Sequence, residues 1–113
     1  MIRTINIDGH EIEMKCTGNT PRVYRNEFTR DLFVDLDEMN KAYLKKGEHT
    51  DFSCIERLAY TMAKQANAEI GTIDEWLDQF DSPMALMMAM PDILGVWNES
   101  QKSIVEQKKE SGR

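Results

Sequence analysis

The chain has 113 residues, 41% of them hydrophobic, and a net charge of −6. This length predicts one domain, and no apolar run approaches the roughly 18 residues that cross a membrane. The first residues also lack the apolar run of a secretory signal, so we expect a soluble cytosolic protein. The acidic balance is concentrated in residues 61–100 and repels phosphate, which disfavours nucleic acids and anionic membranes as partners.

The two cysteines, Cys16 and Cys54, have neither the spacing of a metal site nor that of a redox motif. Nothing else in the sequence points to an oxidising compartment, which favours two free, partly buried thiols. A disulfide between them remains an open alternative at the level of sequence.

The N-terminal segment carries the pattern of a β-hairpin. Isoleucines recur at positions 2, 5 and 7, and a second apolar run contains Ile12 and Met14. Between the runs stands Asp8-Gly9, a pair that readily adopts the positive φ angles of a two-residue turn. The sequence therefore predicts strands at residues 2–7 and 11–16. They must pack on helices, because two strands alone are only marginally stable.

Two helices are predicted before residue 50. Thr20-Pro21 has the form of a helix start, with the threonine as cap and the proline at the first helical position. The second helix is expected at residues 32–46, with acids early, lysines late and Gly47 as the C-terminal cap. Its apolar stripe consists of Leu32, Leu36, Met39 and Tyr43.

A third helix is predicted after Thr50 and is expected to end near Gly71. Its apolar face consists of Phe52, Ile55, Ala59, Met62 and Ala66. Thr72 and Glu75 then form a capping box, in which each side chain satisfies a free N–H group at a helix start. The short fourth helix that follows is expected to bury Trp76 in the core.

The fifth helix is predicted to start at Ser82-Pro83, by the same logic as the first. Pro91 is expected to kink or restart it, because proline lacks the N–H of a helical hydrogen bond. The helix should then continue to about Asn98.

Together these elements predict a mainly α fold, in which a short N-terminal β-hairpin is followed by about five helices. Residues 1–100 are expected to form a single helical domain, and residues 101–113 a polar, flexible tail. Short helices with surplus apolar surface often bury it between copies, so we also expect self-association.

Catalytic signatures are missing from the sequence. It has no Gly-rich phosphate loop, nucleophile elbow or paired metal-binding histidines, and His10 and His49 stand alone. Residues 35–40 have some oxygen ligands at alternate positions but lack the glycine and glutamate of a calcium loop. We interpret them as a solvated first helical turn. The sequence thus predicts no enzyme activity, no metal and no cofactor.

Residues 57–80 imitate a DNA-binding helix-turn-helix, with an alanine-rich helix, a turn at Gly71 and a second capped helix. The second helix, at residues 72–81, carries four acids and no base, which is the wrong sign for contact with phosphates. A DNA-associated regulator is therefore a less favoured alternative, and a generic helical interaction module is another.

The most informative segment is the methionine-rich fifth helix. One stripe contains Leu86, Met90, Ile93, Leu94 and Trp97, while Met84, Met87 and Met88 project to another side. A helix that is apolar around much of its girth is either central in a core or leaves one face for a partner. Because methionine adapts to varied surfaces, Met84, Met87 and Met88 are candidate partner-binding residues, with burial in the core as the alternative.

Five short segments follow one another along the chain: CTGNTPRVYR at 16–25, FTRDL at 28–32, RLAYTMAKQA at 57–66, EWLDQFD at 75–81 and PDILGVW at 91–97. In this order they resemble a known family, the tail assembly chaperones of long-tailed phages and prophages of Gram-positive bacteria. No segment is a chemical motif by itself, and the resemblance rests on their order and spacing. It covers residues 10–98.

The resemblance implies a non-enzymatic protein of virion morphogenesis. Such chaperones bind the tape measure protein, a long helical chain that sets tail length, and help to recruit tail tube subunits around it. They act in the cytoplasm of the bacterial host and are absent from the mature virion. In many phages a ribosomal frameshift yields a longer form. The family supplies no catalytic or cofactor residues, and the methionines at 84–90 are not part of the resemblance.

Overall fold

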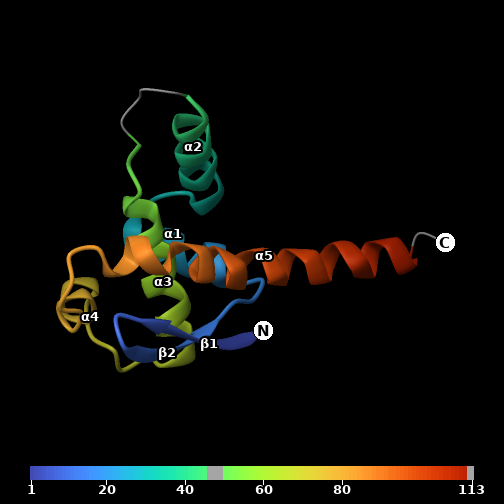
Figure 1. Cartoon of the computed structure of the whole chain (residues 1–113). Coiled ribbons are helices and arrows are strands. Elements are labelled where there is room, and N and C mark those ends of the chain that lie inside the picture. The colour runs from blue at the N-terminus through green and yellow to red at the C-terminus, as the bar shows by residue number, and fades with distance from the viewer. Residues whose placement is uncertain (46–49, 112–113) are drawn as a thin grey trace.

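A computed structural model describes residues 1–45 and 50–111, and for residues 102–111 it describes the backbone only. The chain is small, compact and 61% helical, with an antiparallel two-stranded hairpin before five helices in this described part (Figure 1). This confirms the predicted mainly α character and order of elements. The elements are β1 Ile2–Ile7, β2 His10–Lys15, α1 Thr20–Phe28, α2 Leu32–Leu44, α3 Ser53–Ala66, α4 Ile73–Asp78 and α5 Ala85–Ser111.

The hairpin turns at the predicted pair. Asp8 and Gly9 have φ angles of 52° and 82°, as a two-residue turn between twisted strands requires. Ile7 lies opposite His10, so β2 begins one residue earlier than the sequence predicts. The Asn6 side chain also accepts a hydrogen bond from the Gly9 N–H at 3.0 Å. One face of the hairpin places Ile7, Ile12 and Met14 in the core.

The start of α1 differs from the prediction. Thr20 does not cap the helix but is its first residue and is fully buried. Its hydroxyl accepts a hydrogen bond from the Thr17 N–H at 2.9 Å and donates one to the Gln65 side chain at 2.6 Å. The threonine therefore ties α1 to α3, a contact between distant residues that the local pattern did not contain.

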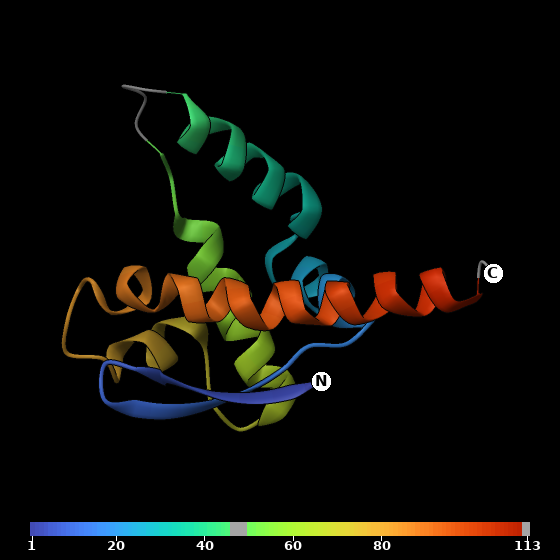
Figure 2. The same cartoon turned by 45° about the vertical axis from the view of Figure 1, so that its right-hand side comes forward.

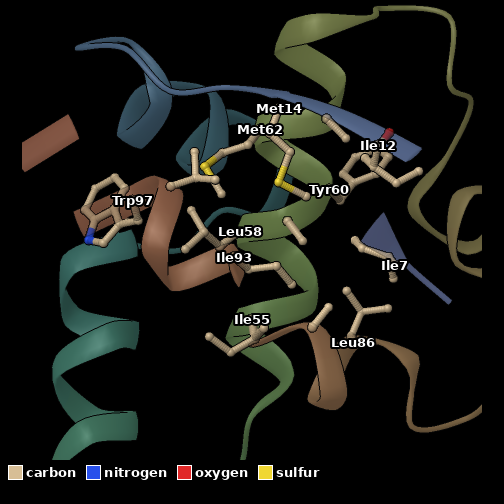
Figure 3. Packing of buried hydrophobic residues seen from close by; sticks show 14 of the residues in the cluster. Ile7, Ile12, Met14, Ile55, Leu58, Tyr60, Met62, Leu86, Ile93 and Trp97 are labelled. Carbon is tan, nitrogen blue, oxygen red and sulfur yellow. The ribbon is translucent and has the colours of Figure 1, made fainter. Parts of the chain in front are cut away.

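Helix α3 is the central element of the core. The hairpin packs against it through β2, and α1, α2, α4 and α5 also contact it. Leu58 and Met62 are fully buried, and the neighbouring Ile93 comes from α5 (Figure 3). The helix ends at Ala66, before the predicted end near Gly71, because Asn67 leaves the helical conformation. The Asn67 side chain then accepts a hydrogen bond from the Glu69 N–H, which forms a turn.

The capping box of α4 is confirmed. The Thr72 hydroxyl accepts a hydrogen bond from the Glu75 N–H at 3.2 Å, and Glu75 accepts one from the Thr72 N–H at 3.1 Å. Trp76 is buried as predicted, with its ring edge-on to those of Tyr60 and Phe80. These aromatic pairs fix α4 against α3.

Helix α5 starts at Ala85, two residues after Pro83, and runs through Pro91 without interruption. The proline neither ends nor restarts the helix, because buried residues on both sides of it, such as Ala89 and Ile93, hold it to the core. The helix also continues to Ser111, past the predicted end near Asn98, and projects beyond the body (Figure 1). The segment 101–111 has no glycine or proline and many good helix formers, so the anchored helix propagates through it.

Candidate protein-interaction surface

Two of the three candidate methionines are exposed at the start of α5. Met84 is 54% exposed and Met88 is 78% exposed, and the Met88 N–H donates to the Met84 carbonyl at 2.9 Å. This hydrogen bond places them one helical turn apart on the same flank. We call Met84 and Met88 the α5 methionine pair.

Met87 lies apart from that pair and is only partly exposed. The spacing of an α-helix places it on the flank that also holds Met90 and Leu94, both partly buried against the core. Trp97 extends this flank, and its ring lies 5.8 Å from that of Phe33 in α2, centroid to centroid. The structure thus places Met84 and Met88 toward solvent and Met87 on the partly buried flank of α5.

A second exposed apolar surface lies on α2, which the sequence did not single out. Phe33, Tyr43 and Leu44 are each more than half exposed, and we call them the α2 apolar face. Tyr43 was predicted to be part of the buried stripe, but it is 66% exposed. The reason is that α2 meets the body near its N-terminal end and then diverges from it, so its last turn lies away from the other elements (Figures 1 and 2). The Tyr43 ring lies edge-on to that of the partly buried Phe52, at 6.3 Å between centroids.

The base of α2 is held by a buried charge, and here the sequence interpretation was wrong. Asp35 is not in a solvated turn but is only 6% exposed. Its carboxylate accepts two hydrogen bonds from Arg30, at 2.8 and 2.9 Å, and one from Arg57 at 3.2 Å. The Tyr24 hydroxyl donates another at 2.5 Å. A single carboxylate therefore joins α2 to α1, to α3 and to the α1–α2 connection.

The groups of this network are poorly suited to proton transfer. The hydrogen bonds from Arg30 lower the pKa of Asp35 to about 2, so the carboxylate stays charged and is a weak base. Burial raises the pKa of the Tyr24 hydroxyl, and the bond to Asp35 raises it further. Asp35, with four donors around it, is thus suited to fix the position of α2 rather than to transfer protons.

The other candidate chemical groups are also accounted for by packing. Both cysteines are buried, free thiols. The Cys54 thiol lies 3.3 Å from the Met39 sulfur, and burial raises its pKa to about 11, which makes it a poor nucleophile. The exposed His10 packs its ring edge-on against Phe80, whereas His49 lies outside the described residues, as does Gly47. Among the residues that the structure describes, no cluster of His, Cys, Asp and Glu has the geometry of a metal site.

The helix-turn-helix alternative falls on α3 and α4. Helix α4 buries Trp76 and exposes Asp74, Glu75 and Asp78, so its solvent side is acidic. The hydrogen bonds from Thr72 further lower the pKa of Glu75. A recognition helix presents basic and amide side chains to DNA, and this one presents carboxylates.

No family model, curated protein or solved structure matches the chain. Across residues 1–45 and 50–111, no helix is both long enough and apolar enough to cross a membrane. The features that bear on function are therefore the two exposed apolar surfaces, the α5 methionine pair and the α2 apolar face.

Proposed function

We propose that the chain is a non-enzymatic tail assembly chaperone of the kind found in long-tailed phages and prophages of Gram-positive bacteria. In this role it binds the tape measure protein and helps to recruit tail tube subunits during tail morphogenesis. It acts in the cytoplasm of the bacterial host and is not retained in the mature virion. The five ordered segments described above support the family, and the exposed apolar surfaces support the binding role.

The observation that carries the binding role is the exposure of the α5 methionine pair. Burying a side chain as apolar as methionine against a partner lowers the free energy, and Met88 is 78% exposed. A tape measure chain presents many similar helical faces, and the flexible methionine side chain repacks against each without demanding one shape. Helix-in-groove or helix-on-helix contact is therefore the expected mode, with Asp81 and Asp92 at the rim.

The main alternative, a DNA-associated regulator, is disfavoured by the acidic exposed side of α4. A mobility-shift assay at low salt distinguishes the two, because electrostatic binding to DNA is strongest there. A shift at micromolar protein would support the regulator and count against the chaperone.

Co-expression with a tape measure segment tests the proposal directly. We expect the client to be insoluble alone and soluble with the chain. Replacing Met84 and Met88 by glutamine should abolish solubilisation and leave the fold intact, because both side chains are exposed. The matched control is Ile2→Gln, which removes an exposed apolar side chain from β1 instead and should have no effect.

The outcomes separate the function from the site. If the unaltered chain does not solubilise the client, the chaperone function is wrong. If the methionine variant still does so, the function stands and the binding surface lies elsewhere, with the α2 apolar face tested next by Tyr43→Gln with Leu44→Gln. Mass spectrometry of purified particles should detect tail tube protein and not this chain.

A further inference from the structure

The hydrogen bonding of the hairpin leaves one row of backbone groups free on β2. Met1 and Cys16 form a doubly bonded pair, with N···O distances of 3.1 and 2.9 Å. In an antiparallel ladder such pairs alternate with non-bonded ones. The register places Glu11, Glu13 and Lys15 in non-bonded pairs with β1. Their backbone N–H and C=O groups therefore point away from β1.

No strand lies beside this row in the part of the chain that the structure describes, since the sheet has the order β1-β2. Strand β1 contacts α5, and β2 contacts α3 (Figure 2). A free strand edge is a ready template for pairing with another chain, and proteins usually cover or blunt it. Here the edge is open at Glu11 and Glu13.

A surface hollow of about 500 Å³ runs along this edge. On one side it is lined by Glu11, Ile12 and Glu13 of β2, and no residue of β1 lines it. The far side is mixed, with apolar Ala63, Ala66, Ile70 and Trp76 and polar Asn67 and Gln79. Ligand sites in proteins commonly have volumes of about 300–1,000 Å³, so the hollow has the size to take several side chains.

The charge of the hollow has one sign. Its lining contains the carboxylates of Glu11, Glu13 and Glu75 and, within the described residues, no lysine or arginine. Glu11 and Glu13 are exposed on the outer face of β2, whereas Ile12 between them is buried on the inner face. An added strand would follow the same alternation, with every second side chain on each face.

We propose that the free edge of β2 binds an extended segment of a partner protein, which adds a third strand to the hairpin. Its backbone pairs with the N–H and C=O groups of Glu11 and Glu13. Alternate side chains are apolar and enter the hollow toward Trp76, and those between them are basic and lie beside the two glutamates. This surface is separate from the α5 methionine pair and does not depend on the proposed function.

Fluorescence anisotropy tests this with a labelled six-residue peptide of alternating lysine and valine, as long as β2 itself. We expect saturable binding that weakens as salt is raised. Reversing both charges, with Glu11→Lys and Glu13→Lys, should weaken binding by at least about tenfold. The control Glu38→Lys changes the charge of the exposed α2 surface instead and should leave the dissociation constant within about twofold.

Two further probes separate strand addition from charge attraction alone. Glu13→Pro removes an edge-facing N–H, and proline is tolerated where a strand N–H faces outward, so the hairpin should survive while binding falls. A peptide of the same charge, methylated on alternate backbone nitrogens, should also bind weakly to the unaltered protein, and it needs no variant to fold.

Several results would overturn the proposal. Equal affinity for the methylated and unmethylated peptides would show that backbone pairing is not used. Tight binding that survives the double charge reversal would exclude the acidic hollow as the binding site of the peptide. A peptide-free dimer that Glu13→Pro dissociates, seen by sedimentation, would show that a second copy occupies the edge instead.

Discussion

From the burial of Asp35 we predict that replacing it lowers the free energy of unfolding about ten times more than replacing Asp37, another aspartate of α2. Asp35→Ala leaves Arg57 and Tyr24 with an empty site where the carboxylate stood. Removing one partner of a buried charge network typically costs about 3–5 kcal/mol. Asp37 is two residues away and forms an exposed pair with Lys41 at 3.0 Å, so Asp37→Ala should cost only about 0.3–0.5 kcal/mol.

Urea denaturation followed by circular dichroism measures both values on the same scale. Hydrogen exchange should show in addition where the loss falls. Because Asp35 fixes the base of α2, amides of α2 should exchange faster in Asp35→Ala while those of the central helix α3 remain protected. Asp37→Ala should leave both helices protected.

A cost below about 1 kcal/mol for Asp35→Ala would refute the reasoning, because a buried carboxylate with four donors cannot be removed that cheaply. Equal costs for the two aspartates would do the same. A large loss with uniform exchange across α2 and α3 would show that the network supports the whole fold and not the position of α2 in particular.

Four other predictions follow from the structure. Folding lowers the pKa of Asp35 from 3.8 to about 2, so the charged carboxylate contributes roughly 2–3 kcal/mol to the free energy of unfolding. This contribution is lost as the pH falls from about 4 to 2. Urea titrations of Asp35→Asn should show a smaller loss of stability over that pH range. Trp76→Ala should cost about 3–5 kcal/mol and Thr72→Ala about 1 kcal/mol, and an unchanged midpoint for the tryptophan variant would mean an exposed ring. Gly9→Ala should cost about 1 kcal/mol in thermal denaturation, since a φ of 82° strains an alanine. Light scattering should show oligomers that grow with concentration, and a strict monomer up to millimolar protein would contradict the expected self-association.

The sequence by itself determined the features that depend on neighbouring residues. Asp8-Gly9 specified the hairpin turn, and Thr72 with Glu75 specified the start of α4, because the interactions that stabilise these motifs span no more than four residues. The burial of Trp76 followed from its place in a helical apolar stripe. Helix ends were less well determined, because the burial of Ala89 and Ile93 carries α5 through Pro91 despite the local cost of a proline.

Tertiary structure alone decided which partner each face meets. An apolar stripe predicts that one side of a helix is buried, but not which element buries it. The sequence therefore predicted that Asp35 is solvated and Tyr43 buried, whereas in the structure Asp35 is buried and Tyr43 is exposed. The same limit applies to the methionines, because the fold partly buries Met87 and leaves Met88 exposed. The hollow beside β2 exists only because that strand meets residues 63–79, which are distant from it in the sequence, and no local pattern encodes such a contact.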